Sequence, residues 1–294
     1  MILLSCQVSE DLADMLEQYF CGLEHSPWML MRMEEETHFR LSGYFDNHPQ
    51  AEKDWRKLRS RFGVLPEITE KKEIEEESWI NRYRESFKPW SCRGLHWIPL
   101  WMRNSVDAPI GEAVIFIEPG LAFGTGDHPT TRLCTYRLLD FIDSRNGEIK
   151  DCSVIDAGTG SGILALSAAR LGFGSVFGFD IDPNAIQVCA RNLILNQLEG
   201  QVECQQGGVE DCLKGKRVDL VLSNIESDIL CRNSSELLEA IKPGGVLVLG
   251  GIFSREIDSV FGHFLESGEK LGVRFTFDCR AEGDWWDLAV RSLV

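Results

Sequence analysis

A glycine-rich turn after a short apolar strand constrains the fold of this chain more than any other feature. Residues 153–162 read SVIDAGTGSG, and the apolar pattern ILALSAARLG follows at once. The spacing predicts a buried strand, a tight turn at Gly158, Gly160 and Gly162, and then a helix. Glycine permits positive φ and close approach of a ligand, and the free N–H groups at the start of the helix favour an anionic ligand group.

A carboxylate follows at the spacing that a nucleoside site requires. The strand pattern GSVFGFDID covers residues 174–182 and ends at Asp180. An acid about twenty residues after the glycines lies at the tip of the neighbouring parallel strand, within reach of a ribose diol. The two segments predict a nucleoside-binding βαβ unit, with Gly158, Gly160, Asp180 and Ile181 as cofactor contacts. They do not distinguish a dinucleotide from S-adenosylmethionine.

Strands alternate with helices through the second half of the chain. Helices are predicted at residues 132–142, capped by Thr130 or Thr131, at 182–194, capped by Asp182, and at 254–266. Further strands are predicted at residues 113–117, 201–205, 218–223, 246–249, 273–277 and 285–292. The alternation predicts an α/β fold with an open, largely parallel sheet that binds ligands at the carboxyl ends of its strands.

The first seventy residues or so form a separate pattern. A β-α-β-β-α-β order is predicted, with its elements at residues 2–8, 10–20, 29–33, 38–45, 49–62 and 64–69. This order is typical of a small ferredoxin-like domain. We expect the small domain at residues 1–66, a solvated charged linker and helix at 67–88, and the larger domain at 89–294.

Composition limits the partners and the compartment. The chain has 294 residues, ten cysteines and a net charge of -16. An acidic chain is a poor ligand for nucleic acid. Its charge is compatible with a basic protein substrate, whose approach it would steer, or serves only to keep the protein soluble. The cysteines form no C-x-x-C pair, so neither a disulfide framework nor a metal site is expected. Without an apolar run of about eighteen residues or a signal-peptide pattern, we expect no membrane span and a cytoplasmic location.

The segment EPGLAFGTGDHPTT at residues 118–131 is the least ordinary in the chain. Loops of this length in compact domains are often functional. Together with WINRYRESFKPWSCRGLHWIPLW, VIDAGTGSGILALSAARLG, GFDIDPNAI, LVLSNI and IKPGG, it resembles the bacterial methyltransferases that modify the eleventh protein of the large ribosomal subunit, the PrmA family. The matching segments run in order from Trp79 to Gly251. The loop is highly specific, and the other segments occur in many methyltransferases.

The resemblance implies a class I methyltransferase: a Rossmann-like sheet of seven strands whose last strand is antiparallel, S-adenosyl-L-methionine as cofactor, and a small N-terminal domain that grips a basic ribosomal protein. In the family, cofactor contacts fall on positions matching Thr131, Gly158, Asp180 and Asn224 here, and all four residue types are kept. The loop residues Phe123, Gly124 and Thr125 are expected to close over the methionine end of the cofactor.

Two acids depart from the family pattern. The family often has Asn-Ile-Leu-Ala after the fourth strand, whereas this chain has Asn224-Ile225-Glu226-Ser227. Asp127 stands where threonine is common. Both acids are expected near a site meant for an amine, where they strengthen attraction for lysine or mark another substrate.

The expected reaction is methyl transfer to a neutral amine of a protein, on lysine side chains and as a further target the N-terminal amine. A free lysine has a pKa of about 10.4, so the site must favour the neutral form, which desolvation does. Asn224, together with Ile225 beside it, is assigned the catalytic role: the amide and nearby backbone carbonyls accept the hydrogens of the amine and aim its lone pair. A helix N-cap is the competing role for Asn224.

Three other functions remain open from the sequence. The first is a class I methyltransferase that acts on another protein or on a small-molecule amine. The second is a nicotinamide-dependent oxidoreductase built on the same βαβ unit. The third is a cofactor-sensing module on the ribosome that has no catalytic activity. The oxidoreductase is disfavoured because the loop is G-x-G-x-G without the sixth-position glycine, Ile163 following Gly162 directly.

Overall fold

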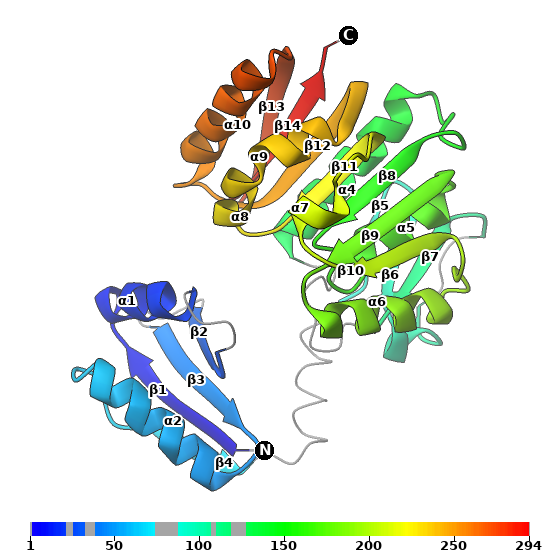
Figure 1. Cartoon of the computed structure of the whole chain (residues 1–294). Coiled ribbons are helices and arrows are strands. Elements are labelled where there is room, and N and C mark those ends of the chain that lie inside the picture. The colour runs from blue at the N-terminus through cyan, green and yellow to red at the C-terminus, as the bar shows by residue number, and fades with distance from the viewer. Residues whose placement is uncertain are drawn as a thin grey trace. The chain divides into compact units, whose positions relative to one another are not determined.

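The chain folds into two units in a computed structural model that describes residues 2–21, 26–32, 39–73, 88–106, 110–118 and 128–293. Contacts within the chain divide it into Met1–Ser86 and Phe87–Val294. Each unit has its own sheet and core (Figure 1). Most of the linker and helix predicted at residues 67–88 lies outside the described residues.

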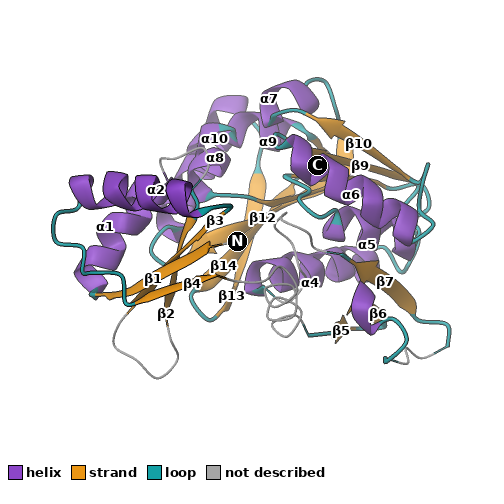
Figure 2. Cartoon of the chain, turned by 90° about the horizontal axis from the view of Figure 1, so that it is seen from below, coloured by secondary structure: helices purple, strands orange, loops and turns teal. Residues whose placement is uncertain are grey.

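The N-terminal unit is a four-stranded antiparallel sheet with two helices. Its elements are β1 (Ile2–Val8), α1 (Glu10–Cys21), β2 (Trp28–Arg32), β3 (Phe39–Phe45), α2 (His48–Arg61) and β4 (Glu70–Glu73). The strand order β2-β3-β1-β4, with every neighbouring pair antiparallel, is the ferredoxin-like order. Alternate residues of β1 share one core cluster with buried residues of both helices, as expected for helices on one face (Figure 2).

Two predictions in this unit are wrong in detail. The last strand is β4 at Glu70–Glu73, not residues 64–69, and Val64 is exposed. The four residues EKKE give no apolar signal, and they pair with Ile2–Ser5 through the backbone. The helical spacing of residues 10–20 predicts one apolar face of Leu12, Met15, Leu16 and Tyr19. The side chain of Met15 is instead 54% exposed, whereas Leu12 and Leu16 are buried.

The larger unit is built on a seven-stranded sheet in the order β10-β9-β8-β11-β12-β14-β13. All neighbouring pairs are parallel except those made by β14, which is antiparallel to both β12 and β13. This confirms the expected Rossmann-like sheet of seven strands with an antiparallel last strand. The strands are β8 (Ser153–Ala157), β9 (Ser175–Asp180), β10 (Val202–Gln206), β11 (Val218–Asn224), β12 (Ile241–Phe253), β13 (Phe275–Glu282) and β14 (Trp285–Ser292).

Helices cover both faces of this sheet. Successive residues of each strand point to opposite faces, so the core consists of two clusters, one on each side of the sheet. One cluster joins Val154, Leu222 and Val248 to three helices: α4 (Pro129–Ser144), α5 (Ile163–Leu171) and α6 (Pro183–Leu195). The other cluster joins the strand residues that point to the opposite face of the sheet to four further helices: α7 (Val209–Cys212), α8 (Ser227–Arg232), α9 (Ser234–Glu239) and α10 (Ile257–Leu271). A strand buried on both faces reads as a continuous apolar run, as VLVLGG in β12 does.

Helix starts follow side-chain caps, with one correction. Asp182 caps α6 through its carboxylate, which accepts from the Asn184 N–H at 2.8 Å, and Pro183 follows, as predicted. The cap of α4 is His128, not Thr130 or Thr131. Its Nδ1 lies 2.8 Å from the Thr130 hydroxyl. Imidazole is an uncommon cap, so the usual preferences favoured the threonines.

A small sheet packs beside α5 and α6. It consists of β5 (Trp90–Cys92), β6 (Leu95–Pro99) and β7 (Ala113–Ile117), and the short 3-10 helix η1 (Leu100–Met102) follows β6. Asn196 at the end of α6 accepts from the Phe116 N–H at 2.8 Å and donates to the Phe116 carbonyl at 2.7 Å. Asn192, one turn earlier, binds Glu118 in the same way, at 2.9 and 3.2 Å. These two amides join β7 to the larger sheet's helix layer. No helix among the described residues has the length and apolarity to cross a membrane.

The Asn196 amide gives a test of this packing. Replacing Asn196 with leucine keeps the volume but leaves the Phe116 N–H and carbonyl without their partner, which we expect to lower the free energy of unfolding by about 2–4 kcal/mol. The measurement is urea denaturation of the full chain followed by tryptophan fluorescence. Gln187→Leu, on an exposed position of α6, is the control and should change stability by about 0.5 kcal/mol or less. Equal stability of both variants would show that these hydrogen bonds do not hold β7.

Candidate active site

Four strand ends of the larger sheet meet at one cavity. Parallel order brings the carboxyl ends of β8, β9, β10 and β11 to the same edge, which is where α/β sheets bind ligands. The cavity there has a volume of about 780 Å³, enough for a nucleoside-sized ligand. The described residues that line it come from these ends and the loops that follow them, from the start of α4, from α7 and α8, and from β12 and β14.

The glycine turn forms as the sequence predicts. Gly158, Gly160 and Gly162 all have positive φ, of 75°, 54° and 84°, and Gly162 is the N-cap of α5. A Cβ on Gly158 would lie 2.2 Å from Cγ2 of Ile225, so the tips of β8 and β11 can approach this closely only with glycine. The turn therefore brings its backbone to the cavity wall.

Asp180 joins the glycine turn to the tip of β9. Its Oδ2 accepts from the Gly160 N–H at 2.9 Å, and its Oδ1 accepts from the Asp182 N–H at 3.0 Å. Each carboxylate oxygen retains a further lone pair, and Asp180 lines the cavity. The carboxylate is held in one orientation in which it can accept hydrogen bonds from two neighbouring hydroxyl groups.

Asn224 ends β11 with a polar atom that has no protein partner. Its Oδ1 is buried and, among the described residues, accepts no hydrogen bond. Helix α8 starts at Ser227 after the N-cap Glu226, which makes no side-chain cap bond, so Asn224 is not the helix cap. Buried amide oxygens are nearly always satisfied, and an unsatisfied one beside a cavity indicates a ligand donor. Ile225 and Glu226 continue the cavity wall from Asn224.

The structure brings together six of the predicted site residues and separates one. The six that line the cavity are Gly158, Gly160, Asp180, Ile181, Asn224 and Ile225. Thr131 is 1% exposed and is not among the lining residues, whereas Thr130 is. Phe123, Gly124, Thr125 and Asp127 lie outside the described residues. The Oγ1 of Thr131 is also buried with no hydrogen-bond partner in the described part of the chain, and its cofactor contact stays a prediction.

An aromatic wall and the tip of β10 complete the cavity, and the sequence analysis missed both. His128 and Trp285 line it with ring centroids 4.9 Å apart at 71°, and Phe253 lies against Trp285 with a centroid distance of 3.9 Å. Gly207, Gly208 and Val209 lie where β10 ends. The position of Gly207 after a predicted strand was a usable signal, whereas nothing local to Trp285 connects it with a site in the middle of the chain.

The cavity carries negative charge. Asp180, Glu210, Asp211 and Glu226 line it, and Arg232 is the single arginine or lysine among the described lining residues. Such a wall attracts a cationic ligand and repels free anions.

A second carboxylate is buried beneath the glycine turn. Asp156, 1% exposed at the end of β8, accepts at Oδ2 from the Thr159 hydroxyl at 2.7 Å and from the Ala165 N–H at 3.0 Å. Burial raises the pKa of its carboxyl from 3.8 to about 6, although these two hydrogen bonds oppose the shift. Its Oδ1 has no partner within the described ranges. Asp156 shapes the turn from behind and is not a lining residue.

The sheet order and the cavity at its strand ends define a class I methyltransferase fold. The family profile described as ribosomal protein L11 methyltransferase (PrmA) matches residues 12–291. The chain belongs to this family. A ribosomal protein L11 methyltransferase of Pelobacter propionicus is 38% identical over 219 residues, which cover 74% of this chain and 68% of the relative.

Two further relatives agree with this family. A ribosomal protein L11 methyltransferase of Dictyoglomus turgidum is 29% identical over 262 residues, covering 88% of this chain and 82% of the relative. The crystal structure of a ribosomal protein L11 methylase from Lactobacillus delbrueckii subsp. bulgaricus has a TM-score of 0.58 at 27% identity, covering 69% of this chain and 97% of that one. The chain is thus a methyltransferase, which decides against the oxidoreductase and the sensor without catalysis.

Titration of Asp156 makes stability depend on pH. Because its pKa is higher in the folded chain than the unfolded value of 3.8, the folded state binds more protons between pH 3.8 and about 6. This contribution to stability is present at low pH and is lost as the pH rises through that window. Asp156→Asn removes this pH-dependent contribution. The free energy of unfolding of the variant, relative to that of the wild type, should therefore rise by about 2 kcal/mol from pH 4 to pH 7. Urea denaturation of both proteins at the two pH values measures this gain, and a gain of zero would contradict the burial of a titrating carboxyl.

Proposed function

We propose that this protein uses S-adenosyl-L-methionine to methylate amines of the ribosomal protein L11 of its own cell, on lysine side chains and as a further target the N-terminal amine. The buried Oδ1 of Asn224, which has no partner among the described residues, carries the proposal, because it offers an uncharged acceptor at a strand tip that lines the cavity. The names of the family and of its relatives supply the substrate class.

The residues present fit this cofactor. Asp180 offers two oriented acceptor oxygens for a ribose diol, and the N–H groups that begin α5 favour the carboxylate of the methionine moiety. The acidic lining suits the positive charge of the sulfonium and of the incoming amine. When bound, S-adenosyl-L-methionine supplies an electrophilic methyl group on sulfur.

The protein's own contribution is alignment and desolvation. A cavity wall of aromatic rings and Ile225 disfavours the charged form of a lysine, so the amine loses its proton to water on entry. The Asn224 amide oxygen accepts an N–H of the neutral amine and directs the lone pair toward the methyl carbon. Alignment of this kind can lower the barrier by up to about 7–11 kcal/mol. Because the amine's proton leaves before the transfer, no dedicated base is required, and the methylated nitrogen remains protonated.

The acids that line the cavity bear on substrate choice. Glu226 lies two residues after Asn224 and lines the cavity, at a position where the family often has leucine. A carboxylate there raises the local concentration of ammonium groups before desolvation. We further propose that the ferredoxin-like domain, which includes β4 at Glu70–Glu73, recognises the ribosomal protein, that the residues after β4 link it to the catalytic domain at 89–294, and that the reaction takes place in the cytoplasm. The basic surface of a ribosomal protein complements a chain with a net charge of -16.

Loss of the Asp180 carboxylate tests the cofactor site. Asp180→Ala should weaken binding of S-adenosylhomocysteine about tenfold or more, since hydrogen bonds to a charged group contribute about 1.5–3 kcal/mol. Isothermal titration calorimetry measures the affinity. Asp182→Ala is the matched control: it removes a cap acid two residues away that does not line the described cavity, and the affinity should be unchanged. Equal affinities of wild type and Asp180→Ala would remove Asp180 from the site.

Mass spectrometry of the candidate substrate tests the function itself. Incubation of ribosomal protein L11 with the wild-type protein and S-adenosyl-L-methionine should add one or more increments of a methyl group to lysine or the N-terminal amine. Asn224→Ala should bind S-adenosylhomocysteine nearly as well but turn over about a hundredfold more slowly. Labelling of another protein in a ribosomal mixture, with L11 unmodified, would instead establish a methyltransferase with a different amine substrate.

A further inference from the structure

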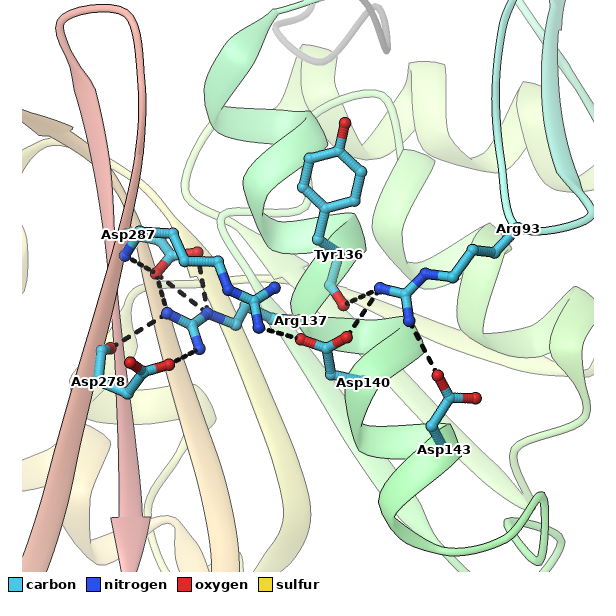
Figure 3. Close-up of polar contacts among 8 residues, drawn as sticks. Arg93, Tyr136, Arg137, Asp140, Asp143, Asp278 and Asp287 are labelled. Atoms are coloured by element: carbon cyan, nitrogen blue, oxygen red, sulfur yellow. Dashed lines mark hydrogen bonds and ion pairs between the residues drawn. The ribbon is translucent and has the colours of Figure 1, made fainter.

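A row of ion pairs joins α4 to the β13–β14 hairpin, and its innermost pair is buried. Nε of Arg137 lies 3.0 Å and 2.9 Å from the two carboxylate oxygens of Asp287, and its Nη2 lies 2.6 Å from Oδ1. The side chains are only 7% and 0% exposed. Figure 3 shows Arg137 extending from the helix to the hairpin, where the Asp278 carboxylate of β13 accepts from Nη1, on the other edge of the guanidinium group.

The two ends of this pair belong to the elements that form the aromatic wall. His128 is the N-cap of helix α4 and lies about two and a half turns before Arg137. Strand β14 begins at Trp285, and Asp287 lies two residues later, so both side chains leave the same face of the strand. One buried contact therefore fixes the helix that carries His128 against the strand that carries Trp285.

Asp287 also faces an irregularity in β12 that reaches Asn224. Leu249 pairs with Leu288 and Ile252 with Trp286, so two glycines of β12, Gly250 and Gly251, lie opposite the single residue Asp287. A Cβ on Gly250 would lie 2.7 Å from Sγ of Cys134 on α4 and 3.1 Å from Oδ1 of Asn224. The helix, the bulge and the Asn224 amide are thus packed closely together, so a shift of α4 on the sheet would displace the bulge on which Asn224 rests.

The outer pairs of the row do not share this connection. Arg280 binds Asp140, one turn further from the cavity along α4, and Arg93 binds Asp140 and Asp143 beyond it. These side chains are 34–73% exposed, and such pairs contribute little to stability. The buried pair is costly to desolvate and is weak evidence for stability in itself. Its distinguishing property is its position under the cavity wall.

We propose that Arg137 and Asp287 are positioning residues for methyl transfer: their ion pair holds His128 and Trp285 against the β12 bulge, so that the wall aligns the acceptor amine with Asn224. Neither residue is among the described residues that line the cavity, so neither touches the substrate. This proposal rests on the proposed function, since the aligned group is the acceptor amine of that reaction.

Three variants separate positioning from support of the fold. Asp287→Asn keeps the shape of the side chain and removes its charge, which leaves Arg137 without its buried counter-ion and with only the exposed Asp278 to pair with. The double variant Arg137→Met with Asp287→Leu removes both charges, a replacement that often leaves stability unchanged or improved. Arg280→Gln is the matched control, because it breaks the neighbouring pair between the same helix and hairpin.

The readouts are thermal melting, kcat with saturating cofactor and the 1H–15N signal of the Trp285 indole, assigned with Trp285→Phe. We expect Asp287→Asn to melt earlier and the double variant to melt near the wild type. The double variant should nevertheless show a shifted Trp285 signal and a kcat reduced about tenfold or more, because small misplacements of reacting groups are costly. The Kd for S-adenosylhomocysteine should be unchanged, and Arg280→Gln should match the wild type in signal and kcat.

A stable double variant with the wild-type Trp285 signal and wild-type kcat would overturn the proposal and leave the pair a purely structural contact. If the wild type methylates no amine, the proposed function fails, and the indole signal then decides alone: a shift in the double variant but not in Arg280→Gln supports the positioning of Trp285, and its absence overturns it.

Discussion

The contacts between the glycine turn and the tip of β9 are the interaction on which the site depends. The N–H groups of Gly158 and Thr159 both donate to the Phe179 carbonyl at 2.9 Å, and the Gly160 N–H donates to the Asp180 carboxylate at 2.9 Å. These bonds exist only because β8 and β9 are parallel neighbours in register, with Ala157 opposite Phe179. They orient the Asp180 carboxylate and the glycine turn that leads into α5 together, and these are the groups to which we assign the cofactor.

The strand tips carry different chemistry because their surroundings differ. At β9 a charged acceptor, Asp180, is fixed by two backbone N–H groups, which suits the hydroxyl donors of a diol. At β11 the acceptor is the neutral amide of Asn224, buried and without a partner in the described chain. A neutral acceptor binds the N–H of an amine without holding it in its charged form, which a buried carboxylate would do. The acids that attract the ammonium, such as Glu226, lie along the wall instead.

The sequence predicts those features that are local in the chain. The glycine turn, the position of Asp180 at the tip of its strand and the Asp182 cap were confirmed because a few consecutive residues determine each one. The wall formed by His128 and Trp285 was missed because the two residues are far apart in sequence and meet only through the packing of α4 on β14. Strand β4 was misplaced because EKKE forms a strand through backbone pairing with β1 and not through an apolar pattern. The bulge at Gly250 depends on the β14 register, which no local pattern encodes.

The account places one cofactor against the tips of β8, β9 and β11, and a crystal structure with S-adenosylhomocysteine tests this most directly. We expect the ribose hydroxyls within hydrogen-bond distance of the Asp180 carboxylate and the sulfur facing the Asn224 amide across the cavity. A ligand bound elsewhere, or one in this cavity with its ribose away from Asp180 and its sulfur away from Asn224, would contradict the account.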